Sequence, residues 1–235
     1  MRRQIIPALV FTALASVVLG LVYPLVIYGI GQLGFRHQAD GSLITRNGQV
    51  VASSLLGQRF SNAAGKPLPQ YFQPRPSAAG TGYDGTESGA ANLGPSDPRL
   101  IAQCLPVQVT GRDGRPELGR HGKPVYEHTS DGSLVCDPDT VPQLAKAYRE
   151  FNGLAPGTPV PVDAVTSSGS GLDPDISVDN ADLQAPRVAR TRHLPLAVVM
   201  RLVRANTAGR TLDFLGEVRV NVVELNLALE RLSQR

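Results

Sequence analysis

A run of small polar residues is the first segment of the chain whose residue types could do chemistry. Ser167, Ser168, Gly169, Ser170 and Gly171 are consecutive. Successive backbone amides in such a turn can cradle an anion, and the hydroxyls can add contacts. The same residues are also typical of a tight turn between a strand and a loop. Because no Lys or Arg lies nearby in the sequence to pair with a phosphate, these residues alone favour the turn.

Two cysteines and two histidines form the second candidate group. Cys104 and Cys136 enclose a polar, Gly-rich stretch that includes His121 and His128. The spacing of His121, His128 and Cys136 matches no established metal site, so we expect these residues to lie on the surface. Cys104 and Cys136 either form a disulfide that closes the stretch or stay as two free thiols. The disulfide requires an oxidising compartment.

Other strings that suggest chemistry lack the sequence context that the chemistry requires. Gly80 to Gly85 reads as a dinucleotide-binding fingerprint, but Gly/Pro-rich sequence surrounds it where a strand and a helix are needed. Asp173 to Asp179 resembles the start of a calcium loop, except that Val178 stands where that loop needs Gly. No phosphate loop, nucleophile elbow or helical His pair occurs in the sequence. We therefore expect no catalytic residue, no metal site and no tightly bound cofactor.

An uncharged N-terminal segment precedes all of these residues. Ile5 to Ile30 is mostly Leu, Val, Ile and Ala and contains no charge. As a helix it would be about 39 Å long, enough to cross a hydrocarbon core of about 30 Å. The run is longer than the apolar part of a cleaved signal peptide, which favours a retained anchor. Arg2 and Arg3 predict a cytoplasmic N-terminus, residues 1–4, and a domain outside the cytoplasm, residues 31–235.

Small residues recur every four positions along this segment, at Ala8, Thr12, Ser16 and Gly20. Close backbone packing at small residues drives helix association in membranes, so the stripe favours docking against partner helices over the chance occurrence of common residues. Pro24 removes one backbone hydrogen bond and predicts a kink near the outer end of the helix.

Composition and periodicity predict an α+β domain beyond the membrane. The formal net charge is +3, with 23 Lys+Arg against 20 Asp+Glu and no Trp, which argues against a nucleic-acid-binding face. Turn and capping signals predict the following elements: a hairpin over 42–53 with Asn47-Gly48 at its turn, a loop over 61–99, a helix over 144–151, an extended segment over 159–166, a helix from the Ser177 cap to about 191, a helix from Pro195 to before Gly209, a strand over 217–220 and a helix capped by Asn221.

Several strings, taken in order, resemble one family. They are Tyr71-Phe72, Arg75-Pro76-Ser77-Ala78, Ser88-Gly89, Asn92-Leu93-Gly94-Pro95, Pro159 to Asp163, Val165-Thr166, Ser168 to Pro174, Ile176-Ser177, Gln184, Pro186 to Arg190 and Val220 to Leu229. Together they are similar to KdpC, the family of small C subunits of bacterial high-affinity potassium-transporting Kdp ATPases. The resemblance covers the membrane helix and most of the outer domain. The stretch near 101–140 looks like an insertion, so its Cys and His residues inherit no role.

The resemblance implies a non-catalytic subunit of an ATP-driven potassium-uptake complex in the cell inner membrane. Its partners would be a potassium-channel-like subunit, a P-type ATPase subunit and a small single-helix subunit. The family is described as a catalytic chaperone that raises the ATP affinity of the hydrolysing subunit, with ATP held in a ternary complex. The implied nucleotide contact is Ser167, Ser168, Gly169 and Ser170, although Ser167 stands where the family has Gln.

Two functions of different class therefore remain open from the sequence. One is the assembly subunit just described, with its main domain periplasmic. The other is a membrane-tethered extracytoplasmic enzyme or solute-binding domain that acts alone. The predicted periplasmic placement conflicts with a direct contact to ATP, which is hydrolysed in the cytoplasm, and we favour the placement.

Overall fold

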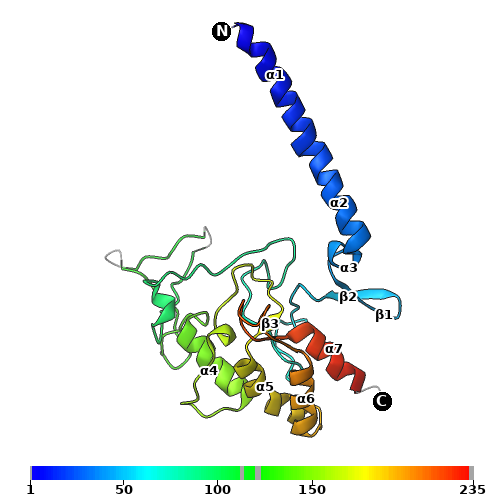
Figure 1. The fold of residues 1–235 in the computed structure, drawn as a ribbon. Helices are drawn as coiled ribbons and strands as arrows, with labels where there is room; N and C mark the ends of the chain where they lie inside the picture. Colours follow the sequence, from blue (N-terminus) through cyan, green and yellow to red (C-terminus); the bar gives the residue numbers. More distant parts are fainter. Residues whose placement is uncertain (1, 112–113, 120–122, 233–235) are drawn as a thin grey trace. The chain divides into compact units, whose positions relative to one another are not determined.

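The computed structural model describes residues 2–111, 114–119 and 123–232 (Figure 1). The chain folds as two compact units, Met1–Leu55 and Leu56–Arg235. The first unit contains α1 (Arg2–Val17), a π-helical turn (Val18–Val22), α2 (Tyr23–Gly34), α3 (Arg36–Ala39), β1 (Leu43–Arg46) and β2 (Gln49–Ser53). The second contains α4 (Val141–Asn152), β3 (Asp175–Ile176), α5 (Val178–Thr191), α6 (Leu196–Ala205), β4 (Thr207–Ala208), β5 (Arg219–Asn221) and α7 (Val222–Leu232), with short 3₁₀ turns at Pro98–Leu100 and Val162–Ala164.

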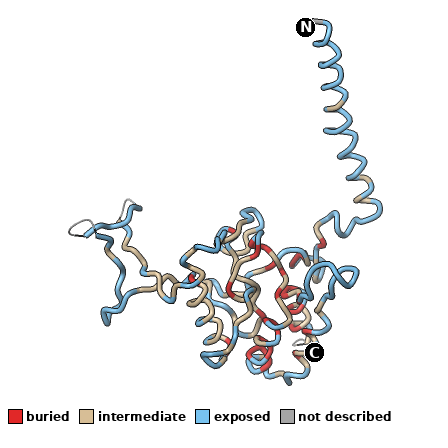
Figure 2. Tube along the Cα trace, turned by 60° about the vertical axis from the view of Figure 1, so that its left-hand side comes forward, coloured by how far each residue is buried: buried red, intermediate tan, exposed pale blue. Residues whose placement is uncertain are grey.

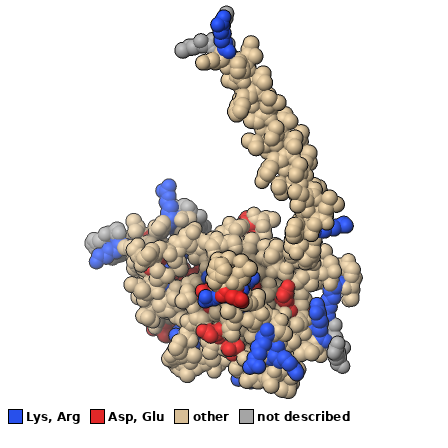
Figure 3. All heavy atoms as spheres, in the orientation of Figure 1, with Lys and Arg blue, Asp and Glu red and all other residues tan. Residues whose placement is uncertain are grey.

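The first unit is dominated by one long apolar helix. Arg3–Gly34 is 32 residues long and is a candidate membrane span by length and composition. Its apolar side chains are exposed along the helix (Figure 2). No acidic or basic side chain interrupts the stretch from Gln4 to Phe35 (Figure 3). An exposed apolar helix of this length is stable in lipid rather than in water, which agrees with the predicted span over 5–30.

Near Pro24, where the sequence predicts a kink, the structure has a π-helical turn over Val18–Val22. Pro24 has no amide hydrogen to donate to Gly20, and its ring crowds that carbonyl. The amide of Tyr23 donates instead to the carbonyl of Val18, five residues earlier. The helix therefore continues through the proline by widening over one turn.

A short hairpin ends the first unit. β1 and β2 pair antiparallel, with Arg46 opposite Gln49. The turn residues Asn47 and Gly48 have φ values of 50° and 78°, which is the left-handed pair that a two-residue hairpin turn requires. The hairpin predicted over 42–53 is confirmed.

The second unit is a small three-stranded sheet covered by helices. The strand order is β3-β5-β4 and both pairings are antiparallel. The core joins α5, α6 and α7 to this sheet, and the buried residues gather there in Figure 2. Its largest apolar members are Phe72, Ile176, Leu225 and Leu229. The predicted α+β class is confirmed.

Local capping fixes where the helices begin. Ser177 accepts a hydrogen bond from the amide of Asn180 at the start of α5, and Asn221 accepts one from the amide of Glu224 in α7. Both caps are confirmed. The helix predicted over 144–151 begins earlier than expected, because Thr140 caps α4. The segment predicted as extended over 159–166 contains the 3₁₀ turn instead, and the strand predicted over 217–220 starts at Arg219.

The stretch near 101–140 forms a narrow arm of three chain segments. The amide of Val107 donates to the carbonyl of Val135, Val135 donates to Glu127, and Glu127 donates back to Val107, at 2.8–2.9 Å. A second cycle of the same kind joins Val109, Val125 and Glu117. Because the described side chains of residues 101–139 are exposed or half-buried, backbone hydrogen bonds rather than a core hold the arm together. The predicted surface excursion is confirmed.

A buried guanidinium anchors the loop that crosses the core. Arg187 in α5 is 2% exposed. Its side chain donates to the carbonyls of Tyr71 and Pro69, to Oδ1 of Asn152 and to Oε1 of Gln184. Burial lowers the pKa of Arg187 to about 10, which still leaves it charged at neutral pH. The loop that carries Pro69 and Tyr71 is not paired with a strand at these two carbonyls. The Arg187 guanidinium supplies the donors that a neighbouring strand would otherwise supply.

We expect Arg187→Leu to lower the free energy of unfolding by about 3 kcal/mol or more, because several buried acceptors lose their donor. Arg190→Leu, at an exposed position of the same helix, is the matched control and should change stability by about 0.5 kcal/mol or less. Urea unfolding of the full chain in detergent, followed by circular dichroism, measures both. Equal effects of the two substitutions would contradict this role of Arg187.

Candidate functional site

We call residues 167–171 the serine-rich loop. It lies between the 3₁₀ turn at Val162–Ala164 and β3, within the second unit. Residues 88–91 run beside it, because the amide of Gly89 donates to the carbonyl of Ser170 and the amide of Ala91 donates to Oγ of Ser167, both at 2.9 Å. Hydrogen bonds therefore attach the loop to a neighbouring segment of the chain.

The hydroxyl groups of the loop have partners inside the protein. Oγ of Ser170 accepts from the amide of Leu172 at 3.1 Å, and Oγ of Ser168 lies 3.4 Å from Oγ of Ser170. Ser168 is buried, whereas Gly169 and Ser170 are exposed. The amide of Gly169 has no hydrogen-bond partner among the described residues. The exposed Gly169 amide is therefore available to an external acceptor.

Arg75 holds the first part of the loop. Its guanidinium donates to the carbonyls of Thr166 and Ser167, at 3.3 and 3.1 Å, and lies 3.7 Å from the carboxylate of Asp173. The hydroxyl of Tyr83 donates to the Arg75 carbonyl at 2.8 Å. Burial, with a smaller contribution from Asp173, raises the pKa of Tyr83 well above its usual value, so the phenol stays protonated and remains a donor. Arg75 lies far from the loop in the sequence, but the fold brings its basic side chain into contact with the loop.

Gly171 is the position where the loop needs a glycine. Its φ is +69°, and an added Cβ would lie 2.3 Å from the Gly89 carbonyl oxygen. The carbonyl of Gly171 accepts from Oγ of Ser77 at 2.6 Å, and that same Oγ accepts from the amide of Tyr83. The close approach of these backbones is possible only without a side chain at 171.

A cavity of about 230 Å³ opens beside the loop. It is lined by Thr166 to Gly169, Ala90 to Leu93 and Leu100, and no basic side chain is among these residues. Small-molecule sites typically measure about 300–1,000 Å³ and place a few polar groups around the ligand. The cavity could therefore hold one small polar group against the Gly169 backbone, but it is too small to enclose a whole nucleotide.

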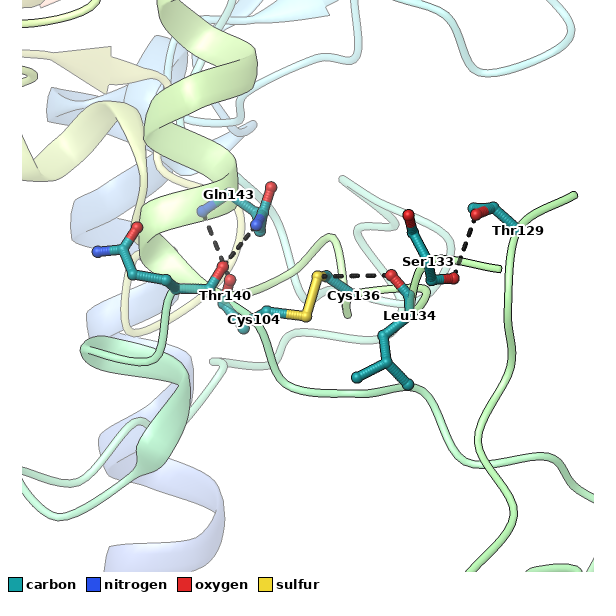
Figure 4. The surroundings of a disulfide bond; sticks show 8 residues. Cys104, Thr129, Ser133, Leu134, Cys136, Thr140 and Gln143 are labelled. Carbon is teal, nitrogen blue, oxygen red and sulfur yellow. Dashed lines mark hydrogen bonds between the residues drawn. A yellow bond between two sulfur atoms is a disulfide. The ribbon is translucent and has the colours of Figure 1, made fainter. Parts of the chain in front are cut away.

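The structure joins Cys104 and Cys136 in a disulfide whose Cα atoms lie 4.9 Å apart (Figure 4). The bond closes the base of the arm beside the start of α4. There Nε2 of Gln143 donates to the carbonyl of Gln103, the residue before Cys104. The disulfide therefore ties both ends of the arm to the helical body.

The remaining candidates do not form a site together. His121 lies outside the described residues, and His128 is exposed, with Nδ1 2.9 Å from the Tyr126 carbonyl. Among the described residues no group of three His, Cys, Asp or Glu side chains could hold a metal ion. Gly80 and Gly82 lie in turns with positive φ rather than between a strand and a helix, so the dinucleotide fingerprint is only a string match.

The small-residue stripe lies in the first unit. Ala8, Thr12 and Ser16 belong to α1, and Gly20 lies in the π-helical turn. All four are exposed, and a Cβ at Gly20 would meet no other atom within 4 Å. The stripe is thus available along the helix. Its role in packing stays a prediction.

Sequence reasoning missed two contributors to the loop. Arg75 is distant in sequence and lies in a Pro-rich loop. The one sequence signal for its role is that it is an isolated charge between Pro74 and Pro76. The contact of residues 88–91 with Ser167 and Ser170 comes from backbone groups and has no sequence signal.

Taken together, these observations describe a small α+β domain carried on one apolar N-terminal helix, with a closed polar loop and no assembled catalytic group among its described residues.

Comparison with known proteins gives the family. The family described as "KdpC: K+-transporting ATPase, c chain" matches residues 5–146 and 136–231. The chain is 44% identical to a Mycobacterium tuberculosis potassium-transporting ATPase KdpC subunit over 99% of this chain and 100% of that protein. KdpC subunits of Acidobacterium capsulatum and Gemmatimonas aurantiaca are 41% and 43% identical, over 96% and 99% of this chain and 96% and 95% of those proteins. The chain therefore belongs to the KdpC family of potassium-transporting ATPase subunits.

Gly171→Ala should lower the free energy of unfolding by about 2 kcal/mol or more, because it adds a left-handed backbone penalty to a clash with Gly89. Gly169→Ala is the matched control in the same loop: no atom lies within 4 Å of its Cβ position, and the expected change is about 0.5 kcal/mol. Urea unfolding of the full chain in detergent measures the difference. A Gly169→Ala effect as large as that of Gly171→Ala would refute this account of the loop.

Proposed function

We propose that this chain is a non-catalytic subunit of a Kdp potassium-uptake ATPase in the cell inner membrane. It assembles with a potassium-channel-like subunit, a P-type ATPase subunit and a small single-helix subunit, and it stabilises their complex. The observation that carries the proposal is the match to KdpC subunits over both the apolar helix and the α+β domain. A soluble enzyme would have no use for an exposed apolar helix of 32 residues.

The apolar helix is the proposed means of assembly. In lipid the apolar side chains gain nothing by meeting other helices, so association depends on close backbone contact at small residues. Ala8, Thr12, Ser16 and Gly20 supply such contacts on one side of the helix. Pro24 carries no amide hydrogen, so it cannot donate to the Gly20 carbonyl four residues earlier.

The chaperone role, in which the chain raises the ATP affinity of the hydrolysing subunit, is part of the proposal. Support for a direct contact is limited to the backbone of Ser167 to Ser170: the Gly169 amide is free of described partners, and Arg75 lies behind the loop. The small cavity and the bonded hydroxyls favour an indirect effect through the partner subunits. ATP would then be bound by the hydrolysing subunit.

The proposed placement is N-terminus in the cytoplasm and residues 31–235 in the periplasm. Arg2 and Arg3 at the start of the span support it. The disulfide between Cys104 and Cys136 supports it independently, since disulfides persist in oxidising compartments.

Co-expression of the full chain with the other subunits of its ATPase tests the function. We expect the subunits to co-purify in mild detergent and the isolated chain to hydrolyse no ATP. The complex that contains the chain should show a lower KM for ATP than the same subunits purified without it. Failure of the wild-type chain to co-purify, with all subunits expressed, would overturn the proposal.

Thiol labelling tests the placement, because the chain has two cysteines. With a membrane-impermeant maleimide on intact spheroplasts, the wild-type chain should remain unlabelled. Cys104→Ser should be labelled at Cys136, which is half-buried and so within reach of the reagent. A chain lacking both thiols is the matched control for background. Labelling of the Cys104→Ser chain only after permeabilisation would place the domain in the cytoplasm.

A further inference from the structure

The hairpin tip between β4 and β5 carries large apolar side chains into solvent. We call Gly209–Val218 the apolar knob. Leu212 is 74% exposed, Phe214 68% and Leu215 50%. Every residue from Ala208 to Arg219 is exposed, so none of these side chains contributes to the core. A contiguous exposed apolar group on a small domain marks an interaction site more often than a single exposed Leu does.

The knob is held in one shape by its own hydrogen bonds. The amides of Thr211 and Leu215 donate to each other's carbonyls at 2.8 and 2.9 Å. Below the tip, Arg210 pairs with Glu217 at 2.9 Å. The apolar side chains are therefore presented on a closed turn and not on a loose loop.

This shape strains the backbone. Leu212 has φ 54° and Asp213 has φ 65°. A left-handed conformation costs a residue with a Cβ about 1–2 kcal/mol, and Leu, unlike Asn or Gly, has no local means to offset it. Strain of this kind persists where surrounding interactions over-determine it, and strained residues cluster at functional sites. Here the shape places Leu212 and Phe214 on the outermost part of the turn.

The base of the knob borders an acidic recess. Gly216, Glu217, Val218 and Arg219 line a cavity of about 540 Å³ together with Asp163, Asp173, Asp175 and Arg75. Four carboxylates and two guanidiniums thus line the recess, and Glu217 is also paired with Arg210 just outside it. Arg219 pairs with Asp175 at 2.9 Å and Arg75 lies near Asp173 at 3.7 Å. Burial, and then the charge of Asp173, raise the pKa of Asp175, whereas its pairing with Arg219 acts in the opposite direction.

Charge decides between the candidate occupants. A bilayer is disfavoured because Asp213 would have to enter it between Leu212 and Phe214, and because anionic headgroups would meet the acidic recess. A symmetric contact with a second copy of the chain would bring two acidic recesses together. A protein surface with an apolar socket and basic residues around it satisfies both the knob and the recess.

We propose that the apolar knob docks in such a socket on the extracytoplasmic face of a transport subunit of the same complex. The inference rests on the proposed function and adds to it the surface that makes the contact. Leu212 and Phe214 enter the socket as anchors, and the basic rim of the socket lies against Asp213 and the acidic recess.

Photo-crosslinking in the assembled complex tests the proposal directly. A benzophenone amino acid replaces Phe214 in the full chain, co-expressed with the other subunits of its ATPase. The matched control carries the same group at Ile101, which is 81% exposed and lies outside the knob. We expect an adduct between position 214 and a transport subunit, and none from position 101. An adduct to phospholipid or to a second copy, or no adduct although the subunits co-purify, would overturn the docking while leaving the proposed function intact.

Leu212→Asn gives a second test with two readouts of opposite sign. Asn tolerates a left-handed backbone, so this variant should unfold at a higher temperature than the wild-type chain. It removes an anchor, so the chain should dissociate from the complex about tenfold faster or more. Ile101→Asn is the control and should leave dissociation unchanged. A Leu212→Asn chain that is more stable and dissociates at the wild-type rate would refute the role of the knob. Wild-type subunits that do not co-purify would instead refute the proposed function.

Discussion

The second unit depends on side chains that take the place of strand partners. The loop that carries Phe72 crosses the core without joining a sheet, so its backbone polar groups need donors and acceptors from elsewhere. Asn226 in α7 accepts from the amide of Phe72 and donates to its carbonyl, both at 2.9 Å. Gln184 in α5 makes the same paired contact with the backbone of Gln73. Arg187 covers the carbonyls that precede them. Among the described residues no buried side-chain polar atom lacks a partner.

This arrangement determines where the serine-rich loop lies. The chain leaves the Gln184 contact at Gln73 and enters the Pro-rich segment that carries Arg75 and Ser77. Arg75 then binds the carbonyls of Thr166 and Ser167, and Ser77 binds the carbonyl of Gly171. Displacement of the Phe72 loop would move both contacts, although neither is near Arg187. Buried polar groups in α5 and α7 therefore anchor the segment that carries Arg75 and Ser77, and this segment in turn binds the backbone of the serine-rich loop.

Local signals in the sequence predicted the elements well because each signal has a local cause. Ser177 and Asn221 cap helices through amides three residues ahead, and Asn47-Gly48 adopts a turn that needs only its own backbone angles. The uncharged N-terminal run is likewise a property of consecutive residues. Contacts between distant segments left no such signal. The three-segment arm is held by backbone bonds that any residue can make, and the clamp by Arg75 joins residues about ninety positions apart. The sequence therefore predicted the turn at 167–171 but not what surrounds it.

Two strained residues show how the knob differs from the rest of the domain. Tyr83 also has a positive φ, of 59°. Its amide is bound by Oγ of Ser77 and its hydroxyl by the carbonyl of Arg75, and its ring fills the space beside Gly57. The strain at Tyr83 is thus offset within the chain. Leu212 has the same kind of strained backbone, but its side chain is exposed to water. It has no comparable set of contacts among the described residues. The hydrogen bonds within the turn hold the Leu212 backbone, and the proposed socket would supply the side-chain contacts that Tyr83 finds within its own chain.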